Sequence, residues 1–534
     1  MIEDLVLSPG TRYRIVAPNG AVVRAGVASD SRQLHHLPSG VLVVCAERGR
    51  DDGGRQCIRI ASPAGWVNAD ALGPVPAVTK TTLDYDTFTA RHRQVSPGDH
   101  YGLEFPIDLA GLREAGPPFL TAAFRASGAL SADNRVTQIV SLDKLDIRGA
   151  SENGLLTLAY ARDERGLQTH LFVKFPPTDA HHKYGLLRLS DGEIRMARLS
   201  RERQLPVTVS RYYFGDHSSH TGNYILITER VPFGVGAVEP AYRKGYDHEV
   251  PCVEEHYAVL TRNLARLVAA HKRGDLGHDL EEIFPFAAAA RDFEPIADPE
   301  PALDRLIDFI GRVAPQLFAP EVTRPQFLAT WREDVLFGLE HKDAVLAYLL
   351  SDVDYTGLCH INLNVDNAWF WRDEGGQLHA GLLDWGGAGQ ASLAQALSGM
   401  MMMPEPEKYI ELVNRMIDLF IEECSAQGGP SLDRTELHFQ YKASVYSTAI
   451  FMFITILSEA LKSFPEDYFA SMENRMDPRL LEGGFYSAIV WIDNMLREWL
   501  DPLTPGEACR RIVARDTDAV AYRASLAKGS SRRR

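Results

Sequence analysis

The 534-residue sequence has few cysteines, no metal-knuckle spacing and no long apolar run. Its six cysteines are scattered and none belongs to a Cys-x-x-Cys pair, so neither a zinc ribbon nor a disulfide scaffold is indicated. The most apolar stretch, residues 445–457, is shorter than the roughly 20 residues that a membrane helix needs. The first residues show no basic flank before an apolar segment, so we expect no secretory signal. A reduced, cytoplasmic setting without a membrane partner is the prediction.

Positive charge is also scarce. Lysine and arginine total 56 against 71 acidic residues, which gives a net charge of −15. Nucleic-acid binding depends on clustered positive charge at the phosphates, so we expect no nucleic-acid partner. The length favours several domains with a core large enough to need no covalent support.

The first 75 residues differ in pattern from the rest of the chain. Short β-prone runs alternate with Pro, Gly and Asn turns at residues 13–16, 21–24, 41–44, 57–60 and 65–67. Eight basic and seven acidic residues leave this segment almost neutral, so the acidic excess lies elsewhere. Closely spaced short strands predict a small all-β barrel over residues 1–75, followed by a Pro- and Gly-containing linker.

Three short motifs of this segment are Val23-Arg24, Leu37-Pro38-x-Gly40 and Gly65-Trp66-Val67. They resemble the bacterial-type Src homology 3-like domain. The resemblance implies a peptide or protein ligand for the barrel. The alternative is a spacer or docking module without chemistry of its own.

The rest of the chain predicts an α+β fold with a β-rich part before a helical part. Strand-like runs occupy residues 136–142, 155–160, 170–175 and 224–228, with a helix over 191–202. Apolar residues recur at helical spacing over 253–272, and further helices are expected near 302–313, 325–350, 405–425, 436–463 and 480–498. The predicted domains after the barrel are a linker and helical lead-in (76–117), a β-rich lobe (118–232), a helical lobe (233–505) and a tail (506–534).

The most informative motif is a polar loop between apolar strands. Residues 359–371 read Cys-His-Ile-Asn-Leu-Asn-Val-Asp-Asn-Ala-Trp-Phe-Trp, and residues 381–386 read Gly-Leu-Leu-Asp-Trp-Gly. Two neighbouring strands would bring Asn367 and Asp384 near one point. A carboxylate and an amide oxygen suit Mg²⁺, which keeps waters and phosphate oxygens as its other ligands.

This motif resembles the catalytic core shared by aminoglycoside phosphotransferases, choline kinases and ecdysteroid-kinase-like proteins, which have a protein-kinase-like fold. Their loop reads His-Gly-Asp, four residues, then Asn, and an Ile-Asp-Trp strand end follows. His360 matches the family histidine, Asn367 lies five positions after Asn362, and Asp384 lies within Leu-Asp-Trp. The resemblance covers about residues 118–500 and implies a two-lobed fold that uses ATP and Mg²⁺. It also implies a small-molecule hydroxyl as the substrate.

The same resemblance assigns roles upstream of the loop. Lys174 corresponds to the phosphate-contacting lysine and Glu193 to its helical partner, while Asn367 and Asp384 are the metal ligands. Glu229 and Val231 lie in the segment that resembles the hinge, where the backbone contacts adenine. Lys174 as a solvated strand lysine and Glu193 in a surface ion pair are the alternatives.

One position departs from the family pattern. The catalytic aspartate is here Asn362, which can orient a hydroxyl but cannot accept its proton near neutral pH. Asp366 is either a substitute base or a carboxylate that braces the loop, and His360 is expected to brace the loop by hydrogen bonds. An active phosphotransferase, a ligand-binding pseudokinase and a barrel-domain adaptor on a kinase-like scaffold therefore remain open.

Overall fold

A computed structural model describes residues 12–15, 17, 21–37, 42–60, 65–74, 83–145, 151–277, 279–289, 298–447, 450, 454 and 457–515. Pro38 and Gly40 of the barrel motif, part of the linker, part of the apolar stretch 445–457 and residues 516–534 lie outside the described residues. The chain forms two compact units. The helical unit comprises Met1–Pro76, Tyr242–Asp366 and Gln390–Arg534, and the β-rich unit comprises Ala77–Ala241 and Asn367–Gly389.

The N-terminal segment is built from short strands, as the sequence predicts. The strands are β1 (Arg12–Ile15), β2 (Ala21–Arg24), β3 (Gln33–Leu37), β4 (Leu42–Val44), β5 (Glu47–Arg50), β6 (Gln56–Ile60), β7 (Gly65–Asn68) and β8 (Leu72–Pro74). They form sheets of order β4-β1-β8 and β3-β2-β7-β6-β5. Their buried core is drawn wholly from residues between Tyr13 and Leu72. The Src homology 3 likeness stays a prediction.

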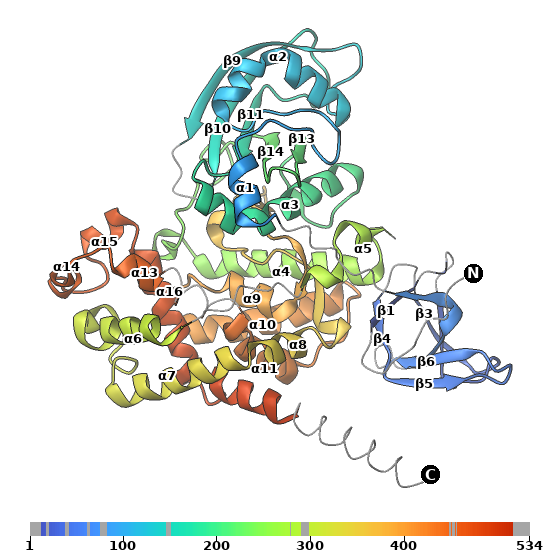
Figure 1. Ribbon diagram of the computed structural model, residues 1–534, viewed down its shortest axis with the longest axis vertical. Coiled ribbons are helices and arrows are strands. Elements are labelled where there is room, and N and C mark those ends of the chain that lie inside the picture. The colour runs from blue at the N-terminus through green and yellow to red at the C-terminus, as the bar shows by residue number, and fades with distance from the viewer. Residues whose placement is uncertain are drawn as a thin grey trace. The chain divides into compact units, whose positions relative to one another are not determined.

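A five-stranded antiparallel sheet is the centre of the β-rich unit (Figure 1). Its order is β13-β14-β11-β10-β9. The bounds are β9 (Val136–Leu145), β10 (Glu152–Tyr160), β11 (His170–Phe175), β13 (Tyr212–His217) and β14 (Tyr224–Glu229). The unit also contains α1 (Tyr85–Arg91), α2 (Leu109–Ala126), α3 (Ala180–Glu202), β12 (Thr208–Val209), β16 (Ala368–Arg372) and β17 (Leu378–Leu382).

Alternation along the strands gives the sheet two apolar faces. On β14, Ile225 and Ile227 belong to the core cluster that contains α2, whereas Tyr224 and Leu226 pack with Ile194 of α3. Successive strand residues point to opposite faces, so α2 covers one face and α3 the other. The predicted strands and the α+β class are confirmed.

Helix α2 crosses a predicted domain boundary. The sequence predicts a helical lead-in up to residue 117 and a β-rich lobe from residue 118, but one helix spans both: it begins at Leu109 and contains a kink at Gly116, whose φ is 62°. Pro117 and Pro118 follow the kink, where proline is tolerated at the start of the second helical part. Leu112 is buried in the same core as Leu120. The end of the predicted lead-in 76–117 is therefore part of the core.

Helices dominate the helical unit, as predicted (Figure 1). They are α4 (Val253–Arg273), α5 (Leu280–Ile283), α6 (Glu300–Asp308), α7 (Pro325–Glu340), α8 (Lys342–Leu349), α9 (Leu393–Met400), α10 (Tyr409–Ala426), α11 (Arg434–Ser444), α13 (Ser458–Leu461), α14 (Glu466–Ala470), α15 (Pro478–Gly483) and α16 (Tyr486–Arg497). Strands β15 (Thr356–Cys359) and β18 (Gly389–Ser392) pair with each other. None of the helices in the described part of the chain combines the length and the hydropathy that crossing a membrane requires.

Two predicted boundaries differ from the structure. The predicted tail starts at residue 506, but residues 505–515 are helical, and Ala508, Cys509 and Ile512 are buried among them. The β-rich unit extends to Ala241 and takes in the later segment Asn367–Gly389. The β16–β17 hairpin thus belongs to the same compact unit as the five-stranded sheet.

Candidate active site

Lys174 lies on the face of the sheet that α3 covers. Its neighbours on β11, Val173 and Phe175, are buried in the core on the α2 side. Alternation therefore directs Lys174 to the opposite face. Its cross-strand partner on β14 is Leu226, which packs with α3. The apolar pattern of β11 thus positions a single charged side chain toward α3.

Two carboxylates contact the Lys174 ammonium group. Nζ donates to Glu193 Oε2 at 2.7 Å and to Asp384 Oδ1 at 2.6 Å. Glu193 comes from α3, and Asp384 follows β17. All three residues belong to the β-rich unit, although 210 positions separate Lys174 from Asp384. The structure brings together three residues that the sequence places far apart.

Burial and charge act in opposite directions on this cluster. The side chains of Lys174 and Glu193 are 12% and 8% exposed. Burial alone would lower the pKa of Lys174, but the charges of Asp384 and Glu193 outweigh it and hold that pKa well above its usual value. Burial raises the pKa of Glu193, and the charge of Lys174 opposes this rise. Lys174 is therefore a fixed cation on the α3 face.

Asn367 and Asp384 are adjacent because of hairpin register. In the β16–β17 pair, Ala368 is opposite Leu382. The Leu383 N–H continues the pairing and donates to the Asn367 carbonyl at 2.8 Å. The two predicted metal ligands thus lie at the same end of one hairpin, as the sequence predicts.

Asp384 has an unusual backbone and an accessible side chain. Its φ is +52°, one of two positive values among the described non-glycine residues. Such a conformation costs free energy and is found more often at functional sites than elsewhere. The side chain is 47% exposed even though it contacts Lys174. The Asp384 side chain is therefore only partly buried against its basic partner.

The remaining loop residues belong to the helical unit. His360 is buried, and its Nδ1 accepts the Asn362 N–H at 3.3 Å. Asn364, also buried, donates through Nδ2 to the carbonyls of Gly399 and Met400, both at 3.0 Å. These bonds hold the loop against α9, and the His360 bond has the geometry of a loop brace. The catalytic role predicted for His360 and Asn362 stays a prediction.

Asp366 lies in an acidic and aromatic environment. Its side chain is 14% exposed, and Oδ2 is 4.0 Å from Lys244 Nζ. The pKa of nearby Asp247 is raised to about 7, mainly by burial and also by the charges of Asp366 and Glu405, while a hydrogen bond from the Tyr257 hydroxyl opposes the rise. The helical unit thus holds several carboxylates near the loop.

The predicted hinge residues lie at the end of β14. The Glu229 N–H donates to the Arg211 carbonyl at 2.8 Å, and its Oε1 accepts the Arg211 N–H at 2.9 Å. The Val231 carbonyl accepts the Phe233 N–H at 3.0 Å. Both residues lie in the β-rich unit with Lys174. Their contact with adenine stays a prediction.

No protein-family model and no curated protein match the sequence. Among solved structures, the chain is similar to a macrolide 2'-phosphotransferase type I at 15% identity and a TM-score of 0.31, over 66% of this chain and 94% of that chain. It is similar to an ethanolamine kinase of Plasmodium vivax at 12% identity and a TM-score of 0.35, over 67% and 82% of the two chains.

A third similar structure is a choline kinase of Streptococcus pneumoniae, at 14% identity and a TM-score of 0.32, over 66% of this chain and 94% of that chain. The function proposed below does not depend on the likeness. It rests on the contacts of Lys174, Glu193 and Asp384.

Gly192 is a contributor that the sequence pattern does not identify. A Cβ atom built on it would lie 2.5 Å from the Ala388 carbonyl oxygen and 3.0 Å from the Ala388 nitrogen. Only glycine permits this approach between α3 and the backbone that follows Asp384. The sequence signal that could have indicated this contact is the glycine itself, next to Glu193. A glycine within a helical pattern often marks close packing.

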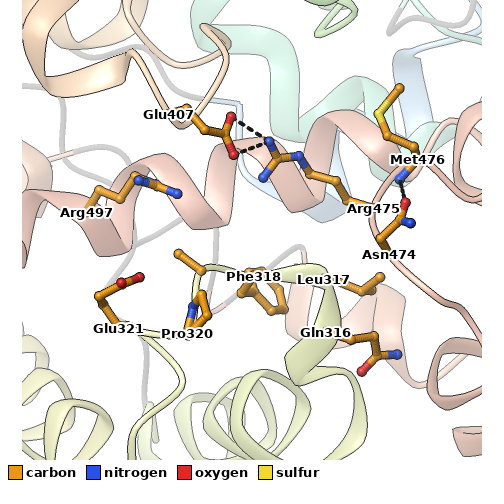
Figure 2. A pocket seen from close by; sticks show the side chains of 11 residues that line it. Gln316, Leu317, Phe318, Pro320, Glu321, Glu407, Asn474, Arg475, Met476 and Arg497 are labelled. Carbon is orange, nitrogen blue, oxygen red and sulfur yellow. Dashed lines mark hydrogen bonds and ion pairs between the residues drawn. The ribbon is translucent and has the colours of Figure 1, made fainter.

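A pocket of about 540 Å³ lies elsewhere in the helical unit (Figure 2). Residues 316–321 line one side, and Asn474, Arg475, Met476, Glu407 and Arg497 complete it. Figure 2 shows Arg475 directed at Glu407, and the two pair at 2.5 and 2.6 Å. None of the site residues predicted from the sequence lines this pocket.

Proposed function

We propose that this chain is an ATP- and Mg²⁺-dependent phosphotransferase that acts on a hydroxyl group of a small molecule. The observation that carries the proposal is the contact of Lys174 with both Glu193 and Asp384, next to Asn367. A buried cation, its fixed carboxylate partner and an accessible carboxylate are the parts that phosphoryl transfer requires around a nucleotide.

The donor set fits the proposed cofactors. Asp384 and Asn367 offer oxygen atoms, which are the ligands that Mg²⁺ prefers. When bound, the metal would neutralise charge on phosphate oxygens. Lys174 would contact the phosphates, and Glu193 would keep Lys174 extended toward them. Glu229 and Val231 are proposed to contact adenine through their backbone.

The acceptor side depends on the loop that contains Asn362. An amide can accept a hydrogen bond from the substrate hydroxyl and orient it, but it cannot take the proton. Asp366 follows four residues later and is partly exposed, so we propose that its carboxylate takes the proton. Because phosphoryl transfer relies mainly on positioning and charge, turnover would continue without the usual aspartate.

ATP turnover by four proteins tests this proposal: the wild type, Asp384→Ala, Asp366→Asn and Asn362→Asp. We expect measurable ADP formation by the wild type and none above background by Asp384→Ala. If Asp366 is the base, Asp366→Asn lowers the rate by about 10²–10⁴-fold. Full activity of Asp384→Ala would contradict the proposal.

A second candidate function has one observation in its favour. Asn362 replaces the acid that the related loops contain, which suits a protein that binds nucleotide without turnover. In that case the wild type binds ATP but forms no ADP, and Asn362→Asp restores at most a slow reaction. A peptide ligand for the N-terminal strands and a cytoplasmic location are further predictions of the sequence.

A further inference from the structure

Three potential metal ligands meet on the β-rich unit, at a place that does not include Lys174, Glu193 or Asp384. His217 ends β13, Asp191 lies in α3, and His100 lies in the segment between α1 and α2. One ligand atom from each residue lies within 4.8 Å of the others. It is the one group of three His, Cys, Asp or Glu side chains that comes this close in the part of the chain that the structure describes.

The atoms that converge here are buried and lack hydrogen bonds. His100 Nε2, Asp191 Oδ1 and His217 Nδ1 are each inaccessible to solvent and make no hydrogen bond in the described structure. Buried polar atoms are usually paired, because leaving one unpaired costs about 1–3 kcal/mol. The three atoms come from three separate segments and lie near one point, and although His217 Nδ1 and Asp191 Oδ1 are within ion-pair distance at 3.4 Å, neither makes a hydrogen bond, so a shared ligand would satisfy all three.

The spacing and the donor types suit zinc. Around a tetrahedral Zn²⁺ with bonds of 2.0–2.1 Å, neighbouring ligand atoms lie about 3.4 Å apart. His217 Nδ1 and Asp191 Oδ1 are already 3.4 Å apart. Two imidazoles and one carboxylate are ligands that Zn²⁺ accepts, and the fourth position can hold water.

Neighbouring carboxylates hold the two histidines in place. Asp216 is fully buried, and its Oδ1 accepts the backbone N–H of both His100 and His217 at 2.9 Å. Asp99 Oδ2 lies 3.3 Å from His217 Nε2. A carboxylate at that nitrogen keeps the proton on Nε2 and leaves the Nδ1 lone pair for a metal, which is the usual arrangement around zinc-bound histidines.

Two arginines at the same place oppose a cation. Arg195 pairs with Asp191 through the other carboxylate oxygen, Oδ2. Arg198 Nη1 lies 2.5 Å from His100 Nδ1 and donates to it. A neutral imidazole that accepts at Nδ1 carries its proton on Nε2, so Arg198 has to move before His100 Nε2 can bind a metal. Arg198 therefore competes with the metal for His100.

We propose that His100, Asp191 and His217 form a Zn²⁺ site, that Asp99 orients His217, and that metal binding displaces Arg198 from His100. The site would connect α3 to β13 and to the segment before α2. Asp191 lies two residues before Glu193, so an occupied site would also fix the helix that carries the partner of Lys174. The proposal does not depend on the phosphotransferase function.

Calorimetric titration of Zn²⁺ into the metal-free full-length protein tests the site. We expect one equivalent to bind to the wild type. His217→Ala and His100→Gln should each lose at least 10-fold in affinity, and Asp99→Asn should lose about 10–100-fold, as is typical when the partner of a metal-bound histidine is removed. Arg198→Gln should bind Zn²⁺ more tightly. When His100 Nε2 binds the metal, its Nδ1 carries the proton, and the Gln amide oxygen can accept a hydrogen bond from that Nδ1–H.

Two control variants separate this site from other zinc-binding groups. His379 pairs with Asp373 at 3.0 Å on the exposed surface of the same unit, so His379→Ala should leave binding unchanged. Asp384→Ala should also keep its affinity for Zn²⁺, because Asp384 is not one of the proposed zinc ligands. Zn²⁺ binding can then be judged separately from the proposed nucleotide site. Zn²⁺ should raise the melting temperature of the wild type but not that of His217→Ala. Failure of the wild type to bind Zn²⁺, or binding by His217→Ala and His100→Gln that is as tight as that of the wild type, would overturn the proposal.

Discussion

At the residue scale, Lys174 differs from an ordinary strand lysine because of the carboxylates beside it. Its Nζ contacts one buried and one accessible carboxylate at nearly equal distances. Loss of the contact with Glu193 should cost more stability than loss of the contact with Asp384. Removing one partner of a buried pair leaves an unpaired buried charge, whereas water screens an exposed pair. Glu193 thus stabilises the folded lysine, and Asp384 remains accessible for binding.

Replacing Lys174 should destabilise the protein more than replacing Asp384. Lys174→Met leaves the buried Glu193 without its cation and should cost about 3 kcal/mol in the free energy of unfolding. Asp384→Asn should cost about 1 kcal/mol or less, because that side chain is 47% exposed. Urea unfolding measures both, and Lys144→Met, on the exposed part of β9, is the control. Equal costs for Lys174→Met and Lys144→Met would contradict the buried pair.

Asp247 should make stability depend on pH. Burial, together with Asp366 and Glu405, raises its folded-state pKa to about 7, whereas an unfolded aspartate has a pKa of about 3.9. The folded state therefore holds the proton more tightly, and the stability from this group is complete below pH 4 and is lost as pH rises through 7. Asp247→Asn should remove this loss.

Unfolding free energies of the wild type and Asp247→Asn at pH 5 and pH 8 measure the effect. The variant should gain about 2–3 kcal/mol relative to the wild type between these values. The Tyr257 hydroxyl can donate to the Asn oxygen as it does to the Asp247 carboxylate, so the local hydrogen bond is kept. If the difference in unfolding free energy between the two proteins is the same at pH 5 and pH 8, Asp247 is ionised at both pH values.

At the element scale, α3 and the segment after Asp384 depend on one close approach. Gly192→Ala would place a Cβ against the Ala388 backbone, which cannot rotate away as a side chain could. We expect a loss of about 1–3 kcal/mol in stability and a weaker response to nucleotide, because α3 carries Glu193. Differential scanning fluorimetry with and without ATP·Mg²⁺ measures both.

Gly185→Ala is the matched control in the same helix. A Cβ at Gly185 meets no atom within 4 Å, so alanine should be neutral or should stabilise α3 by about 0.5–1 kcal/mol. If Gly192→Ala and Gly185→Ala change the melting temperature equally, the close approach of α3 to Ala388 does not contribute to stability.

The elements also explain what could be predicted from the sequence. Strands β11 and β14 follow apolar runs, and their positions agree closely with the prediction. The sequence does not indicate strand β13, because Gly215, Asp216 and His217 are residues typical of a loop, and the buried contacts of Asp216 become visible only in the fold. Lys174, Glu193 and Asp384 could be placed by order along the chain. The Gly192 contact could not, because it depends on how closely two backbones approach.

At the scale of the whole molecule, the N-terminal strands have a core of their own. Every buried residue of that core lies between Tyr13 and Leu72, whereas the candidate site draws on residues 174–384. We therefore expect a chain without residues 1–76 to keep its ATP·Mg²⁺-induced increase in melting temperature. Loss of the increase in a folded truncated chain would show that the N-terminal strands contribute to nucleotide binding.

The central claim is that Lys174 and Asp384 hold a magnesium-bound nucleotide. The most direct measurement is the melting temperature of the wild type and of Asp384→Asn in ATP, with and without Mg²⁺. A ligand at 100 times its dissociation constant adds about 2.7 kcal/mol to stability. We predict a clear Mg²⁺-dependent increase for the wild type and none for Asp384→Asn, although both fold. No increase for the wild type at millimolar ATP, or the same increase for Asp384→Asn, would contradict the claim.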